Sequence, residues 1–209
     1  MICSLDKDTP FIWYYAVMKS GSASLQHRPF LIPLWLTAIA AITAAAVFGL
    51  ALLAAWYWAT ANSTTVIVIR HAEKEAVSAA DPALSAAGEA RAALLARMFG
   101  DTKGAGRLDA IYVSATLRSR STAAPLAARL KLAPIEAPAD DPKGLARRVL
   151  RENSGGRVMV IGHINTVPEI VAALAGRSDI PSIDEQDFAT MYVVSVPRIG
   201  RANLVRLSY

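Results

Sequence analysis

The sequence predicts an α/β fold, with a mainly parallel sheet covered by helices on both faces and preceded by one transmembrane helix. Three observations lead to this prediction. Strand-like and helix-like runs alternate along residues 66–209, which is typical of a parallel sheet between layers of helices. The 41 residues from 29 to 69 contain no charged side chain. Two histidines, His71 and His163, each stand directly after an apolar run.

The first predicted element is an apolar helix at residues 31–59. Its centre is the run LWLTAIAAITAAAVFGLALLAAWYW, from Leu34 to Trp58. At about 1.5 Å per residue this run can cross a hydrocarbon layer of about 30 Å. Trp35 lies at one end and the aromatic triplet 56–58 at the other, where such rings prefer the headgroup level of a bilayer. We therefore predict a signal anchor that is retained in the membrane.

Two alternatives to a retained anchor stay open at this point. One is a core helix of a soluble domain, although such helices are shorter and carry a polar face. The other is a cleaved signal peptide, with Ala59–Ala61 as a small-residue cleavage site. The apolar core of a signal peptide is usually only ~7–15 residues long, which favours the anchor. A polar linker is expected at residues 60–65, before the soluble domain.

The flanks of the apolar helix predict its orientation. Residues 1–30 show no periodicity and are expected to be disordered, with Met18 as a second possible start of translation. This tail carries three basic side chains, whereas the other flank has none before Arg70. The positive-inside rule then leaves the amino terminus in the cytoplasm and puts the domain outside. In a bacterium, the prediction is a single-pass inner-membrane protein with a periplasmic domain.

Composition excludes two further classes of protein. A single cysteine, Cys3, rules out an intrachain disulfide framework. The formal net charge of +5 is small and the basic residues are dispersed, so nucleic acid is not an expected partner.

The predicted domain, residues 66–209, begins with a short buried strand at Val66–Arg70. The helix that follows, at Leu84–Phe99, has Ser85 as its amino-terminal cap. The remaining elements are, in order, a strand at 109–114, a helix at 117–130, a short strand at 133–137, a helix at 142–153, a strand at 157–162, a helix at 166–176, and a closing pair of strands at 190–196 and 202–208.

Basic side chains follow the strands at the point where each strand ends. The first strand ends in Arg70 and His71, the second leads through Ser114 to Arg118, and a later strand is followed by His163. Ligands of parallel sheets bind at the carboxyl ends of the strands. Arginine offers planar, bidentate donors to phosphate oxygens, and imidazole can attack phosphorus. The sequence therefore predicts a site for a phosphoryl group at this edge of the sheet.

Four segments resemble, in order, the signatures of the histidine phosphatase superfamily, which has the phosphoglycerate-mutase-like fold. RHAEK, from Arg70, is similar to R-H-G-E. LSAAGEARA, from Leu84, is similar to L-[ST]-x-x-G-x-x-Q-A. VSATLRSRSTAAPLA, from Val113, is similar to S-x-x-x-R-x-x-x-T-A, and VIGHINTVPEIVAAL, from Val160, to G-H-x-x-x-[IV]. The resemblance spans nearly all of residues 65–209.

The resemblance implies a role for each residue of the predicted site. His71 would be the nucleophile that becomes phosphohistidine, while Arg70, Arg118 and His163 would hold the three phosphoryl oxygens. It implies no metal and no other cofactor. The substrate would be a phosphorylated small molecule or a phosphoprotein. Ala72 departs from the family pattern, because glycine is commonest at that position.

The resemblance does not identify a proton donor for the leaving group. One branch of the family places an aspartate directly after the second histidine, where this chain has Ile164. Other members use a glutamate after the third strand. The candidates here are Asp140 and Asp141, ranked above Glu136. If all three are instead solvated loop charges, substrates that need no strong acid, such as phosphohistidine, are favoured.

Glu73 and Asn165 are further possible pocket residues. Only 44 residues separate Arg118 from His163, whereas the mutases of the superfamily insert a larger lid there. We therefore predict a membrane-anchored phosphatase of the minimal branch, which includes phosphohistidine phosphatases. It would hydrolyse a phosphomonoester or phosphohistidine through a covalent intermediate. The alternatives are a non-catalytic module that binds a phosphorylated ligand and a phosphoglycerate mutase.

Overall fold

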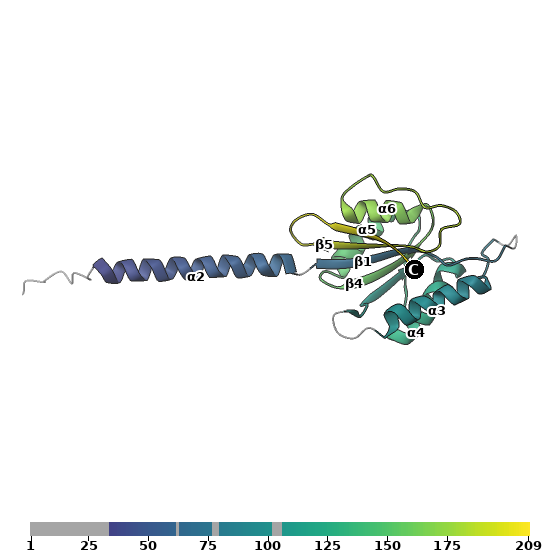
Figure 1. The fold of residues 1–209 in the computed structure, drawn as a ribbon, viewed down its shortest axis with the longest axis horizontal. Helices are drawn as coiled ribbons and strands as arrows, with labels where there is room; N and C mark the ends of the chain where they lie inside the picture. Colours follow the sequence, from purple (N-terminus) through teal and green to yellow (C-terminus); the bar gives the residue numbers. More distant parts are fainter. Residues whose placement is uncertain (1–33, 62, 77–79, 102–105) are drawn as a thin grey trace, which may run out of the picture. The chain divides into compact units, whose positions relative to one another are not determined.

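The computed structural model describes residues 34–61, 63–76, 80–101 and 106–209. The predicted α/β fold is confirmed: a six-stranded sheet lies between two pairs of helices (Figure 1). The tail predicted for residues 1–30, and with it the second possible start at Met18, lies outside the described residues.

The sheet is mainly parallel, as the alternation of elements predicted. Its strands lie in the order β3-β2-β4-β1-β5-β6, and the first four of these are parallel to one another. Strand β5 is antiparallel to both of its neighbours, β1 and β6, and β6 forms one edge of the sheet. The strands are β1 (Ser63–Arg70), β2 (Ala110–Val113), β3 (Ile135–Glu136), β4 (Arg157–Gly162), β5 (Thr190–Pro197) and β6 (Asn203–Ser208).

The helices begin and end close to the residues that the sequence predicts. Ser85 caps the first of them, since its Oγ accepts a hydrogen bond from the Gly88 N–H at 3.2 Å. Gly176 ends the last in the left-handed conformation that glycine adopts without strain. The helices of the domain are α3 (Ala86–Gly100), α4 (Leu117–Leu130), α5 (Pro142–Glu152) and α6 (Thr166–Ala175).

The central strand β1 is buried on both faces. Val66 and Val68 pack in the core beneath α5 and α6, whereas Ile67 and Ile69 pack in the core beneath α3 and α4. A strand buried on both sides needs a nearly continuous apolar run, which is what residues 66–69 supply. The two cores hold the carboxyl end of β1 in a fixed place in the sheet.

The apolar helix α2 (Leu34–Ala61) is 28 residues long. Its stretch Trp35–Trp58 has a mean hydropathy of 2.4, and none of that stretch is buried within the protein. The alternative that this segment is a core helix of a soluble domain does not fit, because a core helix would be mostly buried. The length and composition of α2 suffice to cross a membrane, a property that a signal sequence would share.

The linker predicted at residues 60–65 is wrong. Helix α2 continues to Ala61 and β1 already begins at Ser63, three residues before the predicted start of the strand. Thr64 is buried, and its backbone lies opposite Val196 in the antiparallel pairing with β5. Its hydroxyl also accepts a hydrogen bond from the Gly155 N–H at 3.0 Å. These polar side chains have partners in the sheet, which their polarity alone did not indicate.

Candidate active site

The two predicted histidines meet at the carboxyl edge of the sheet. Strands β1 and β4 are parallel neighbours, with Arg70 opposite Gly162. The His71 N–H donates to the Gly162 carbonyl at 2.9 Å, so the pairing continues one residue past β1. His163 directly follows β4. The ring centroids of His71 and His163 lie 5.3 Å apart in an edge-to-face arrangement.

The hydrogen bonds of His71 define its tautomer. Its Nδ1 lies 2.8 Å from the carbonyl oxygen of Ala72, which can only accept, so Nδ1 carries the proton. The Nε2 atom therefore holds the lone pair. The Nε–H of Arg118 donates to this atom at 3.3 Å. The imidazole is thus held with its nucleophilic nitrogen beside a guanidinium.

Arg70 is held by a segment far along the chain. Its Nη1 donates to the carbonyls of Glu185 at 2.7 Å, Asp184 at 3.2 Å and Asp187 at 3.3 Å. The Phe188 ring lies against the guanidinium, with Cζ 3.9 Å from the ring centroid. The Nε of Arg70 is buried and has no partner among the described residues. The Arg70 side chain is therefore held in place, while its Nε–H group has no acceptor among the described residues.

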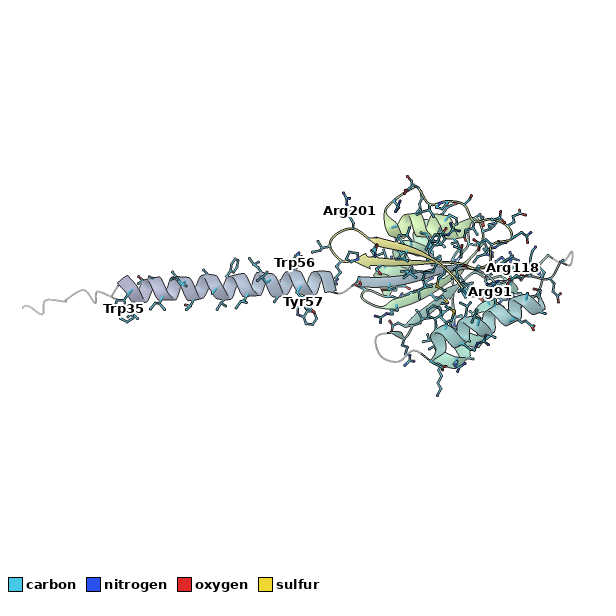
Figure 2. All side chains as sticks on the ribbon, in the orientation of Figure 1. Trp35, Trp56, Tyr57, Arg91, Arg118 and Arg201 are labelled. Atoms are coloured by element: carbon cyan, nitrogen blue, oxygen red, sulfur yellow. The ribbon has the colours of Figure 1, made fainter. Side chains whose placement is uncertain are left out.

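Arg118 lies in the first turn of α4 and is held by an aspartate that the sequence reasoning missed. Asp81 Oδ2 accepts a hydrogen bond from the Leu117 N–H at 2.7 Å, and its Oδ1 lies 3.4 Å from Arg118 Nη1. Figure 2 shows Arg118 at one end of the domain. The sequence did offer a signal: an acidic residue precedes the Leu84–Ser85 segment, in the connection that leaves the end of the first strand.

This geometry agrees with a family match in the sequence. Residues 66–140, which include Arg70, His71 and Arg118, match the model of the histidine phosphatase superfamily (branch 1). This match supports the predicted resemblance to the histidine phosphatase superfamily. No curated protein matches the chain in sequence.

Solved structures share the fold of this chain. The protein histidine phosphatase SixA, complexed with tungstate, has a TM-score of 0.57 at 20% identity over 69% of this chain and 96% of its own. A mycobacterial glucosyl-3-phosphoglycerate phosphatase has a TM-score of 0.55 at 16% identity over 68% and 97%. A putative alpha-ribazole-5'-P phosphatase from Escherichia coli K-12 has a TM-score of 0.55 at 15% identity over 70% and 97%.

Burial and the neighbouring cations favour the neutral form of both imidazoles. Burial lowers the pKa of His71 to about 4, and the nearby His163, Arg118 and Arg70 act in the same direction, against the Ala72 hydrogen bond that raises it. Burial also lowers the pKa of His163, again with Arg118 and Arg70 contributing. A neutral His71 keeps the lone pair on Nε2 that an attack on phosphorus needs.

A titration of the three histidines by proton NMR is expected to show His71 with a midpoint near pH 4, well below its ordinary value of 6.5. The resonance is assigned by its loss in His71→Asn. Adding inorganic phosphate should move the midpoint upward, because a bound anion favours the imidazolium. A midpoint near 6.5 in the ligand-free protein would contradict the described burial.

The same shift predicts how stability depends on pH. As pH falls below 6.5, the unfolded chain binds a proton at His71 while the folded protein does not until about pH 4. The His71 contribution to the free energy of unfolding is therefore fully present above pH 6.5 and is lost progressively between pH 6.5 and 4. Urea unfolding across this range should show a weaker pH dependence in His71→Asn than in the unchanged protein.

Thr122 links the nucleophile to α4. Its hydroxyl accepts a hydrogen bond from the Ala72 N–H at 3.0 Å and donates to the Arg118 carbonyl at 2.7 Å. Both Thr122 and Ala72 are fully buried. The methyl group of Ala72 is thus accommodated where most of the family has glycine. Thr122, the threonine of the S-x-x-x-R-x-x-x-T segment, therefore fixes the backbone after His71 to the first turn of α4.

The predicted proton donors contact other groups. Asp141 caps α5, with Oδ1 accepting from the Gly144 N–H at 2.7 Å, and Glu136 pairs with Arg120 at 3.1 Å. Asp140 is exposed. Within the described residues, none of the three has a hydrogen bond or ion pair with either active-site histidine. Their role as acids stays a prediction.

The two further pocket candidates also have defined surroundings. The Glu73 carboxylate forms an ion pair with Arg91 at 2.7 Å, and Arg91 Nη1 donates to the Tyr209 carbonyl. This pairing lowers the pKa of Glu73. Asn165 is exposed at the start of α6 and makes no side-chain cap bond. Glu73 is therefore engaged in joining β1 to α3, and Asn165 stays a prediction.

Replacing Asp81 is expected to weaken catalysis through Arg118. Asp81→Asn keeps an acceptor for the Leu117 N–H but loses the charge beside Arg118, so we expect kcat/KM to fall by about three- to tenfold, which is roughly 1 kcal/mol. Asp81→Ala also removes the acceptor and should cost about 1 kcal/mol in the free energy of unfolding. Steady-state kinetics and urea unfolding measure the two effects. Equal stability loss in both variants with unchanged kcat/KM would assign Asp81 a purely structural role.

Proposed function

We propose that the protein is a phosphatase in which His71 Nε2 attacks the phosphorus of a phosphomonoester or a phosphohistidine. The observation that carries the proposal is the tautomer of His71, whose Nδ1–H is bound to the Ala72 carbonyl and whose unprotonated Nε2 accepts a hydrogen bond from Arg118. An N–P bond forms as the bond to the leaving oxygen or nitrogen breaks. Water then attacks the phosphohistidine, which releases inorganic phosphate and restores the imidazole.

Charge on the transferred group would be stabilised by Arg70, Arg118 and His163. Negative charge in phosphoryl transfer spreads over three oxygens, and donors held in advance lower the barrier most. Arg70 is held in place by three carbonyls. Arg118 lies beside Asp81 and donates to His71 Nε2, so its Nε–H must pass from the imidazole to a phosphoryl oxygen when Nε2 attacks. The proposal assigns this neutralisation to the guanidiniums and the second imidazole rather than to a metal ion.

The surroundings of the site favour a substrate with a good leaving group. No carboxylate of the described residues has a hydrogen bond with His71 or His163, and Asp81 is engaged with Leu117 and Arg118. Phosphohistidine and activated phosphomonoesters depend least on an acid. SixA is named a protein histidine phosphatase and the mycobacterial structure a glucosyl-3-phosphoglycerate phosphatase, so the fold accommodates both classes.

The test compares three substrates with the full chain in detergent. Phosphohistidine peptide and p-nitrophenyl phosphate should be hydrolysed, and ³²P-labelled substrate should leave an acid-labile, alkali-stable label on the protein. If the protein is instead a binding module, the peptide would bind without release of phosphate. A mutase would isomerise 3-phosphoglycerate. Either of these results, together with the absence of label, would overturn the proposal.

We further propose that α2 anchors the phosphatase domain in a membrane, with the amino terminus in the cytoplasm and, in a bacterium, the domain in the periplasm. The support is the length and hydropathy of Trp35–Trp58 together with the basic residues before it. An alkaline phosphatase fusion at Tyr209 should be active, whereas a cytoplasmic fluorescent reporter there should not. A mature protein that begins at Asn62 would show that the segment is a cleaved signal.

A further inference from the structure

The β5–β6 hairpin lies next to the start of β1. Ser63, the first residue of β1, is the partner of Pro197, the last residue of β5, and the hairpin tip follows at 198–202. In Figure 1 the yellow loop of this hairpin lies at the end of the sheet where β1 begins. One residue separates Ser63 from Ala61, where α2 ends. The Cα atoms of Ala61 and Pro197 are therefore at most about 13 Å apart, whatever the orientation of the helix.

The hairpin tip combines basic and apolar side chains. Arg198 and Arg201 are exposed, and neither forms an ion pair with another described residue. Ile199 lies between them in sequence and is 64% exposed. Gly200, at φ 115°, provides the turn that presents these side chains. Figure 2 shows Arg201 projecting from the hairpin, at the opposite end of the domain from Arg118.

A groove runs beside the tip, between the end of α6 and the end of β5. Its volume is about 620 Å³. Its lining is mixed: Leu174, Ala175, Val196 and Ala202 are among its apolar residues, and Arg177 and Arg201 are its two cations. Arg177 pairs with Asp179, so Arg201 is the cation of this groove without an acidic partner in the described residues.

We propose that this tip and groove form a second membrane contact that binds anionic phospholipids next to the anchor. The proposal rests on the proposed membrane anchor. Guanidinium groups bind phosphate oxygens in planar pairs, and an exposed isoleucine can enter the interface between headgroups and acyl chains. Basic residues next to a membrane helix are attracted to anionic headgroups within a Debye length. The short connection to α2 keeps Pro197, at the base of the tip, within about 13 Å of the end of that helix, a distance comparable to the Debye length.

A rival basic surface lies on α5. Arg147, Arg148 and Arg151 also form a basic face, in which Arg148 and Arg151 share the single carboxylate of Glu152. Of these three, only Arg147 lacks an ion pair in the described residues. Removing two arginines from α5 changes the net charge as much as removing two from the hairpin. The α5 face therefore supplies a control of equal charge.

The experiment uses the full chain in vesicles of phosphatidylcholine, with and without phosphatidylglycerol. In a Cys3→Ser background, an environment-sensitive fluorophore is attached at Ile199→Cys or, as a control, at Ala139→Cys, which follows β3 at the carboxyl edge of the sheet. Lipid-borne spin labels should quench the probe at 199 at least about twofold more than the probe at 139, and more strongly with phosphatidylglycerol. Hydrolysis of p-nitrophenyl phosphate should be unchanged in the protein labelled at 199, because the hairpin lies at the opposite end of the domain from Arg118.

Charge variants decide which surface is responsible. Arg198→Ser with Arg201→Ser should reduce the quenching at 199 to its value in neutral vesicles, whereas Arg147→Ser with Arg151→Ser should leave it unchanged. Loss of quenching in the α5 pair, or equal quenching at 199 and 139, would overturn the proposal. Alkaline extraction distinguishes failure of the second contact from failure of the anchor. Release of the chain from the vesicles would refute both proposals. Retention of the chain without quenching at 199 would refute the second contact alone.

Discussion

Replacing His71 with asparagine is expected to lower the rate of phosphate release by about 10³-fold or more. Asparagine preserves much of the shape and polarity of the imidazole but has no lone pair on nitrogen that can attack phosphorus. The covalent phosphoenzyme should therefore disappear together with turnover. Both are measured on the same sample, with ³²P-labelled phosphohistidine peptide in a quenched-flow experiment.

Two further variants make this result specific. His163→Asn keeps the nucleophile but removes a donor to the phosphoryl oxygens, so the label should still form, more slowly by about 10²- to 10³-fold. His27→Asn changes the histidine of the amino-terminal tail and should leave activity unchanged. Turnover by His71→Asn at more than about a tenth of the unchanged rate would exclude a phosphohistidine intermediate at this position.

The parts of the site that the sequence predicted share one physical cause. Parallel strands end at the same edge of a sheet, so residues that directly follow apolar runs are brought together. His71 and His163 follow adjacent strands and their rings lie 5.3 Å apart. The boundaries of β4 also agree with the prediction, because glycines at 155, 156 and 162 mark them in the sequence.

The parts that the sequence did not predict depend on contacts without a periodic pattern. Arg70 is held by backbone carbonyls of residues 184–187, more than a hundred residues away, and every residue has such a carbonyl. Glu73 has an arginine partner on α3, at Arg91. Asp81 contacts α4 from an irregular connection. Charged side chains in loops reveal their partners only when the chain is folded.

Gly88→Ala is expected to destabilise the domain by about 2–3 kcal/mol, as overpacking in a close contact does. Alanine is favoured over glycine inside a helix by about 1 kcal/mol, so helix propensity alone predicts the opposite sign. A Cβ at Gly88 would overlap the backbone carbonyl of Glu73, which cannot move independently. That carbonyl also accepts the Ser85 N–H at 2.9 Å, so the first turn of α3 would have to shift.

Gly100→Ala, at the other end of α3, is the matched control. Its added Cβ would meet the side chain of Arg129, which is exposed and can move, so we expect a change within about 0.5 kcal/mol. Urea unfolding of both variants gives the comparison. Because Glu73 lies two residues after His71, Gly88→Ala should also lower kcat, whereas Gly100→Ala should not. Equal stability of the two variants would mean that the close approach of α3 to Glu73 does not restrict this position.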